Sequence, residues 1–435
     1  MKRISGRLPF VIALLLLSCH ALFAQHTGKQ RKDGSYSTEI LNLAKNHLSV
    51  EAFHAIDSLE PTTVKELIEL TEIPAPPFKE ILRAQKMKQL FEAAGADKVW
   101  MDSIGNVLAL RQGKKSSHTV VLDAHLDTVF PEGTDVTVRH HSDTLYAPGI
   151  SDDTRGLMVI LTVLRSLEKA KIETAEDLLF VASVGEEGLG DLRGIKYLLK
   201  RNTSKIKTWI SVDGTSINEI VTGALGSLRY KATIRGPGGH SWAAFGLGNP
   251  HHAMAKSINY FSDEALKFTS AVGKTSFNIG RTGGGTSVNA IPFESWAELD
   301  MRSESPEHLL KIDSIFKATM AKGLQDYNKN ILKGAALSLT LTPIGSRPSG
   351  ITSSVNPLVQ RAKAAVALLG GVPELITEST NANIAISKGI SAITIGAGGK
   401  SDHAHALNEW WLNEKGIDGI KLALLITLAE TGVVN

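Results

Sequence analysis

Histidine and carboxylate side chains in this sequence recur at the ends of short apolar runs. His125 and Asp127 follow the apolar run 120–122. Residues two apart on an extended chain point to the same side, so the Asp127 carboxylate can accept the second ring N–H of His125. A carboxylate behind an imidazole fixes its tautomer and raises its basicity in metal sites. Taken alone, the pattern is equally typical of a capped strand end with a solvated aspartate.

Two acidic pairs lie in comparable positions. Asp152 and Asp153 end a loop that leads into an expected helix over residues 155–167. Because aspartate is a common helix N-cap, capping alone would explain one of the two. Glu186 and Glu187 come directly after an apolar run. Adjacent acids repel each other, and a dry strand end is a costly place for them without a cation, so this pair favours a metal site.

The same pattern, an apolar run followed by a histidine or carboxylate residue, occurs twice more. Asp213 follows the run 210–212, and His403 and His405 lie beyond the run 392–395. Open α/β sheets bind ligands beyond the carboxyl ends of their strands. Two imidazoles and three carboxylates are the ligands expected for zinc or a similar ion where thiolates are absent. Two ions about 3.5–4 Å apart, bridged by one carboxylate, would use all five, and a leftover acid could act as base.

The segments that carry these residues alternate between expected strands and helices. Strands are expected at 107–110, 119–122, 178–182, 210–212 and 392–395, and helices at 78–94, 155–167, 192–199, 357–369 and 416–430. A further helix is expected to begin at Glu60, where Pro61 and two threonines follow. This alternation predicts an α/β layer with a mostly parallel, helix-covered sheet.

Residues 226–342 have a different pattern of expected strands and helices. Its alternating strands at 230–235, 295–301 and 337–341 and its helices near 252–260 and 306–322 suggest the order strand, helix, strand, strand, helix, strand. We expect a smaller inserted α+β domain with an open antiparallel sheet. The predicted α/β domain is therefore discontinuous, over residues 37–225 and 343–435.

Composition excludes several classes of protein. The chain has 435 residues, 47 basic against 44 acidic, with 43% hydrophobic residues and one cysteine. These values exclude collagen-like, disordered and multispan-membrane classes. A net charge of +3 gives no reason to expect nucleic acid or an anionic membrane surface as partner.

The N-terminus has the layout of an export leader. Three basic residues precede the apolar run 10–17, which is too short to span a bilayer. We expect a signal peptide over residues 1–24, cut after Ala24, and no transmembrane segment after its removal. The alternative is a lipoprotein-like box ending at Cys19, which would become a lipid-anchored N-terminus. Either way the protein is expected to be exported, periplasmic or extracellular.

Jointly, the segments AHLDTV, GISDDTRG, GEEGLGD, SVDG and HALNEW resemble a family of dinuclear zinc peptidases and deacylases. That family includes peptidase T, carboxypeptidase G, aminoacylase, acetylornithine deacetylase and succinyl-diaminopimelate desuccinylase. The resemblance runs in order from about Thr62 to the C-terminus. The segment 71–77 looks more like the peptidase T branch.

By position, the resemblance implies two Zn²⁺ ions, with Co²⁺ or Mn²⁺ fitting the same ligands. The implied ligands are His125 and Asp213 for one ion, Glu187 and His405 for the other, and Asp152 as the bridge. Asp127 would orient His125, and Glu186 would be the general base that activates a zinc-bridging water. His405 is preferred to His403 because only His405 has the family's spacing to Glu409.

The inserted segment shares the resemblance. The family implies that His240 reaches into a partner subunit's active site and steadies an oxyanion, which would make a homodimer obligatory. Asn289 would face substrate, and Arg302 would grip a substrate carboxylate, although Arg302 could instead pair with Asp300 on the strand surface.

Two classes of function are compatible with these residues. The first is an exported metal-dependent amide hydrolase, an exopeptidase on short peptides or an N-acyl-amino-acid deacylase. The second is a non-catalytic exported peptide-binding protein that keeps the fold. Glu186 at the base position, beside five ligand positions, argues for the enzyme.

Overall fold

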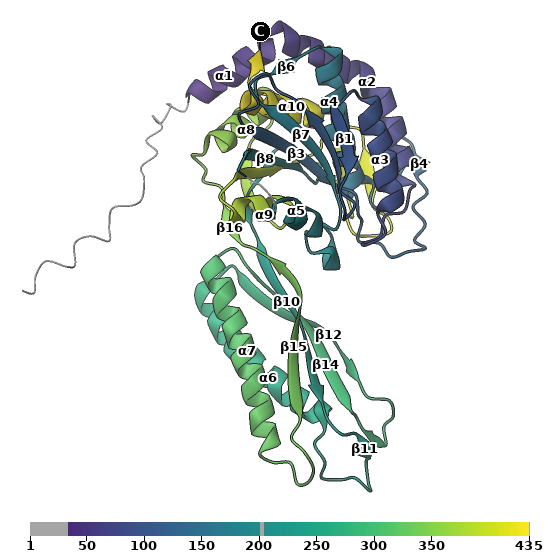
Figure 1. The fold of residues 1–435 in the computed structure, drawn as a ribbon, viewed down its shortest axis with the longest axis vertical. Helices are drawn as coiled ribbons and strands as arrows, with labels where there is room; N and C mark the ends of the chain where they lie inside the picture. The colour runs from purple at the N-terminus through teal and green to yellow at the C-terminus, as the bar shows by residue number, and fades with distance from the viewer. Residues whose placement is uncertain (1–33, 201–203, 435) are drawn as a thin grey trace, which may run out of the picture.

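The computed structural model describes residues 34–200 and 204–434. The predicted leader, Cys19 and the cleavage site after Ala24 lie outside the described residues. The chain forms two bodies, an α/β body and an elongated inserted body, joined by two chain crossings (Figure 1).

The α/β body is built on a nine-stranded sheet. Its strand order is β1-β2-β7-β3-β8-β18-β9-β16, and β17 pairs with β9 in parallel. The four central strands β7, β3, β8 and β18 are parallel to one another, while the pairs β1–β2, β2–β7, β18–β9 and β9–β16 are antiparallel. The bounds are β1 (Lys98–Met101), β2 (Val107–Arg111), β3 (Thr119–His125), β7 (Asp177–Ser183), β8 (Ile206–Val212), β9 (Glu219–Ala224), β16 (Gly350–Ile351), β17 (Glu374–Glu378) and β18 (Ser391–Ile395).

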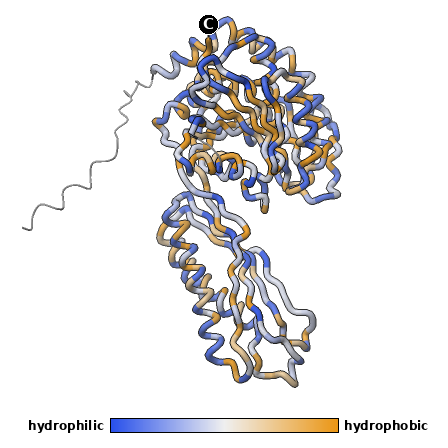
Figure 2. The backbone as a smooth tube through the Cα atoms, viewed as in Figure 1, coloured by the Kyte–Doolittle hydropathy of each residue, from blue (hydrophilic) through white to orange (hydrophobic). Residues whose placement is uncertain are grey.

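Helices cover both faces of this sheet. One face packs against α1 (Gly34–Lys45), α2 (His47–Thr71), α3 (Ile81–Ala93), α4 (Arg155–Lys169), α8 (Pro357–Leu368) and α10 (Gly416–Thr431), and the other against α5 (Arg193–Leu198) and α9 (Ala382–Ser387). In β3, Val120 and Leu122 join the first core and Val121 joins the second. This alternation follows the two-residue period of a strand, and all of β3 is buried. Figure 2 shows hydrophobic residues concentrated along these strands.

The first helices differ from the sequence-based expectation. The helix expected to begin at Glu60 is the second half of α2, which begins at His47 and contains Pro61. The start signal is Asn46, whose side chain accepts the N–H of Leu48 at 2.9 Å. Proline is tolerated here on an exposed face of a long helix whose other face packs on α4.

The inserted body is a four-stranded antiparallel sheet with two helices on one face. Its strand order is β12-β14-β10-β15. The bounds are β10 (Gly226–Arg235), β12 (Thr275–Gly284), β14 (Glu294–Ser303), β15 (Ser338–Arg347), α6 (Pro250–Val272) and α7 (Pro306–Asn328). Every second residue of β14 is buried, as expected for a sheet with one covered face. The predicted mixed α/β class, with a separate antiparallel sheet, is confirmed.

Short strands complete the fold. A small sheet has the order β19-β20-β5-β4, and two strand pairs, β11 with β13 and β21 with β6, stand apart. Their bounds are β4 (Arg139–His141), β5 (Thr144–Tyr146), β6 (Glu173–Thr174), β11 (Gly239–His240), β13 (Ala290–Ile291), β19 (Lys400–Asp402), β20 (Trp410–Leu412) and β21 (Val433–Val434). Among residues 34–200 and 204–434, no helix combines the length and apolar character that crossing a membrane requires.

Candidate metal centre

The histidines and carboxylates predicted from the sequence collect at the carboxyl ends of the parallel strands. His125 is the last residue of β3, Glu186 and Glu187 follow β7, and Asp213 follows β8. Two loops complete the site. Asp152 lies in the turn Ile150–Thr154 before α4, and His405 lies between β19 and β20.

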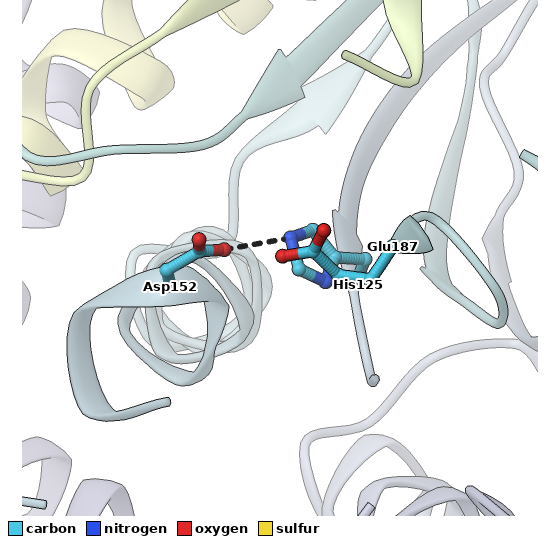
Figure 3. Close-up of side chains that lie close together, drawn as sticks. All are labelled: His125, Asp152 and Glu187. Carbon is cyan, nitrogen blue, oxygen red and sulfur yellow. Dashed lines mark ion pairs between the residues drawn. The ribbon is translucent and has the colours of Figure 1, made fainter. Parts of the chain in front are cut away.

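Three of these side chains face a common point. Ligand atoms of His125, Asp152 and Glu187 lie within 4.8 Å of one another (Figure 3). His125 Nε2 is 3.0 Å from Asp152 Oδ1. His405 approaches the same carboxylates, with Nε2 3.0 Å from Asp152 Oδ2 and 2.9 Å from Glu187 Oε1. Asp152 therefore lies between two imidazoles, where a bridging ligand would lie.

His403 has other partners. Its Nδ1 pairs with the Asn408 side-chain amide at 3.1 Å, and its Nε2 lies 4.0 Å from Asp402. Of the two histidines that the sequence left open, the structure brings His405 to the carboxylates.

Burial and the short distances between charged groups shift the pKa values of the cluster. Burial, followed by repulsion from Asp152, raises the pKa of Asp213 well above its usual range. Hydrogen bonds to Asp152 and Glu187 raise the pKa of His405 to about 10. For Asp152, hydrogen bonds from His125 and His405 outweigh burial and lower its pKa. The buried carboxylates thus require positive charge beside them.

Glu186 stands beside this cluster in a distinct environment. Burial raises its pKa to about 7, against the attraction of Arg347 and with the repulsion of Glu187. Its Oε1 accepts Nη1 of Arg347 at 3.0 Å, and both side chains are buried. A carboxyl group in such surroundings is suited to exchanging a proton near neutral pH.

Asp127 makes different contacts from those expected. His125 Nδ1 pairs with the main-chain oxygen of Asp127 at 2.9 Å, while the nearer carboxylate oxygen is 3.8 Å away. The carboxylate instead accepts the N–H of Glu186 at 3.0 Å and of Glu187 at 2.8 Å. Asp127 therefore links the end of β3 to the segment after β7.

Glu409 holds the turn that presents Asp152. Its carboxylate accepts the backbone N–H groups of Gly149 (2.7 Å), Ser151 (2.8 Å) and Asp152 (3.1 Å), and the Ser151 hydroxyl (2.7 Å). Glu409 is fully buried. A carboxylate with this many donors fixes the backbone around it, and therefore the direction in which Asp152 points.

The donor set fits a divalent metal. It combines imidazole nitrogens with carboxylate oxygens and no sulfur, which suits zinc, cobalt or manganese. Nearby, Asp153 Oδ2 accepts the N–H of His125 at 2.8 Å, while its buried Oδ1 has no partner among the described residues. A cation would offset this excess of buried carboxyl groups.

Two of the predicted residues of the inserted body, His240 and Asn289, lie apart from the cluster. His240 belongs to β11 and Asn289 directly precedes β13, at the far end of that body, and both are exposed (Figure 1). His240 Nδ1 accepts the N–H of Trp242 at 3.2 Å. Arg302, on β14, donates from Nε to Asp300 at 2.6 Å, which is the surface pairing left open by the sequence.

Sequence reasoning missed Arg347 and the role of Glu409. Glu409 entered only as a spacing marker for His405, and its distance of more than 250 residues from its partners left no local signal. Arg347 lies in a strand of the inserted body, far in sequence from Glu186, and nothing in its surroundings marks it.

Known proteins share the sequence pattern and the fold of this chain. The uncharacterized protein YqjE of Bacillus subtilis (strain 168) is 24% identical over 364 residues, covering 80% of this chain and 93% of YqjE. The structure of aminopeptidase PepT from Bacillus cereus ATCC 10987 superposes with a TM-score of 0.65 and 23% identity, covering 84% of this chain and 96% of PepT.

Two further solved structures share the fold. A tripeptidase from Staphylococcus aureus has a TM-score of 0.66 at 22% identity, covering 85% of this chain and 98% of the tripeptidase. Human carnosine dipeptidase 1 has a TM-score of 0.67 at 15% identity, covering 88% of this chain and 99% of the dipeptidase. The sequence profile of Peptidase family M20/M25/M40 matches residues 121–428, a span that contains every residue of the candidate metal centre. The chain belongs to Peptidase family M20/M25/M40 and is a metallopeptidase of that family.

Proposed function

We propose that this protein is an exported, metal-dependent exopeptidase that hydrolyses short peptides. The observation that carries the proposal is the convergence of His125, Asp152, Glu187 and His405 beside the buried Glu186. The names of similar structures, an aminopeptidase, a tripeptidase and a dipeptidase, support peptides as substrates.

The proposed ligands are His125 and Asp213 for one ion, Glu187 and His405 for the other, and Asp152 for both. The likeness to zinc ligands in type and number supports two Zn²⁺ ions. Bound metal would polarise the scissile carbonyl and acidify water. The chain's own groups do the rest. Glu186 takes a proton at its free carboxylate oxygen and later donates it to the leaving nitrogen.

Asp127 keeps the proposed base and metal ligands in register. The Asp127 carboxylate holds the backbone of Glu186 and Glu187 together through two hydrogen bonds. Because Asp127 also binds the His125 ring through its main-chain oxygen, the base and one metal ligand share a single support.

A peptide panel tests the proposal. The purified protein should release amino acids from di- and tripeptides, lose this activity in a chelator, and regain it with Zn²⁺. Co²⁺ or Mn²⁺ is expected to restore it in part. Activity confined to N-acyl amino acids would identify a deacylase. No hydrolysis on either panel, with metal bound, would favour a peptide-binding protein and contradict the proposal.

We further propose a homodimer in which His240 reaches into the active site of the partner subunit. Asn289 is proposed to face substrate, and Arg302 to bind a substrate carboxylate. The exposure of His240 at the far end of the inserted body supports this. Light scattering should give twice the monomer mass. A fully active monomer would contradict it.

Export is proposed from the leader over residues 1–24. Mass spectrometry of protein recovered from outside the cytoplasm should find an N-terminus at Gln25. An N-terminal lipidated Cys19 would indicate the anchored alternative, and an intact Met1 in that material would contradict both.

A further inference from the structure

Two chain crossings join the inserted body to the nine-stranded sheet. One is Leu225, between β9 and β10, and the other is Pro348 and Ser349, between β15 and β16. The buried side-chain amide of Asn383, on α9, donates to the carbonyl oxygens of Leu225 (2.9 Å) and Pro348 (3.1 Å). One amide therefore holds both crossings together.

Arg347 is the last residue of β15, directly before the second crossing. Its backbone still belongs to the inserted sheet, opposite Ser227 of β10. Its guanidinium, however, contacts the α/β body. Nη1 donates to Glu186 Oε1 at 3.0 Å and to Ser379 Oγ at 3.1 Å, and Nη2 donates to the main-chain oxygen of Glu186. Both the Arg347 and Glu186 side chains are 6% exposed.

These contacts fix Glu186 at three points. Arg347 holds its main-chain oxygen and Oε1, and the Asp127 carboxylate holds its N–H. Arg347 uses only one of the two carboxylate oxygens, so the other is left for proton exchange. A planar guanidinium can hold an oxygen on the side chain and one on the main chain at once, whereas an ammonium group presents a single charged point.

We propose that Arg347 is a positioning residue for the base, through which the inserted body sets the placement of Glu186. The expected effect on kinetics rests on the proposed function, because it requires Glu186 to be the base. The contact between Arg347 and Glu186 is independent of that function. A general base works only within hydrogen-bond reach of its proton, so losing this support should lower turnover rather than substrate binding.

The same junction offers a matched control. Asp191 Oδ1 accepts the N–H of Ser346, the residue before Arg347, at 2.8 Å. This contact also joins the two bodies, but it does not touch Glu186. Because Asp191 has a φ of 55°, glycine removes the carboxylate there without backbone strain.

The kinetic test compares Arg347→Met, Arg347→Lys and Asp191→Gly on the best peptide of the panel. We expect Arg347→Met to lower kcat by about 10- to 100-fold, with KM within about threefold and bound metal unchanged. Arg347→Lys should recover only part of the loss, and Asp191→Gly should stay near wild type. A kcat for Arg347→Met equal to that of Asp191→Gly would overturn the proposal.

Chemical rescue gives a readout that a purely structural role would not produce. Guanidinium chloride at low millimolar concentration should raise the kcat of Arg347→Ala severalfold, while the same concentration of KCl should not. Rescue of Asp191→Gly to the same extent, or no rescue of Arg347→Ala, would count against positioning by the guanidinium.

A double-mutant cycle of melting temperatures, measured on metal-free protein, tests the contact between Arg347 and Glu186 independently of enzyme activity. Arg347→Met leaves the Glu186 carboxylate buried and unpaired, so it should lower the Tm. In the Glu186→Gln background the same substitution should lower the Tm by less than half as much. Equal shifts would overturn the pairing. A wild-type protein that is inactive on every substrate would contradict the proposed function. The double-mutant cycle would still show whether Arg347 and Glu186 interact.

Discussion

At the scale of single residues, the candidate site depends on the candidate metal ligands and equally on the residues that hold those ligands in place through hydrogen bonds. Asp152 lies between two imidazoles only because Glu409 holds its turn, and Glu187 is held through its backbone by Asp127. Ligands supported in this way bind metal more tightly than the same side chains on a loose chain, because less freedom is lost on binding.

The two histidines after β19 should differ in their effect on metal. His405→Ala removes a nitrogen next to Asp152 and Glu187, so we expect metal affinity to fall at least tenfold. His403→Ala, which changes a side chain paired with Asn408, should leave affinity within about threefold. Competition with a fluorescent chelator measures both. A larger loss of metal affinity in His403→Ala than in His405→Ala would identify His403 as the ligand instead.

Glu409→Ala should weaken metal binding without removing a ligand. Losing four hydrogen bonds frees the turn of Asp152, and an affinity loss of about 10- to 100-fold is expected from such a support. Glu176→Ala is the control, because Glu176 likewise holds Ser117 and His118 through their N–H groups. It should change the Tm but not metal affinity. Equal affinity losses would show general destabilisation.

At the scale of elements, the parallel strands and the loops after them were the most predictable part. Continuous apolar runs identified β3, β7, β8 and β18, and the helices α4, α7, α8 and α10 were expected nearly within their observed bounds. Helix α2 was expected only in part, because Pro61 has the sequence of a helix start and the actual start at Asn46 depends on packing against the core. Tertiary contact overrides local propensity in such cases.

Pro61 gives a prediction for that element. Proline inside a helix costs about 3 kcal/mol relative to alanine in model helices, so Pro61→Ala should raise the Tm. Thr62→Ala, at the next exposed position, is the control and should change it little. Calorimetry would measure both shifts. A lower Tm for Pro61→Ala would indicate that the proline is required for the packing of α2 on α4.

At the scale of the whole molecule, the two bodies share a loop. The segment after β7 carries Glu186 and Glu187, and the inserted body contacts it through Arg347 and through Arg229, which donates to Gly188 O at 2.8 Å. Sequence patterns located the inserted body but not these contacts, because a pairing between distant segments has no local periodicity. His125, Glu186, Glu187 and Asp213 were predicted from apolar runs and do follow β3, β7 and β8. The contacts of Glu409 and Arg347 could not be predicted in this way, because their partners lie far away in the sequence.

Glu186→Gln tests the central claim most directly. The amide keeps the shape of the side chain but cannot take up a proton. We predict that the variant binds the same amount of zinc as the wild type, measured by metal analysis, and releases amino acids from the best peptide at least 100-fold more slowly. Near-normal turnover in a metal-loaded variant would contradict the account.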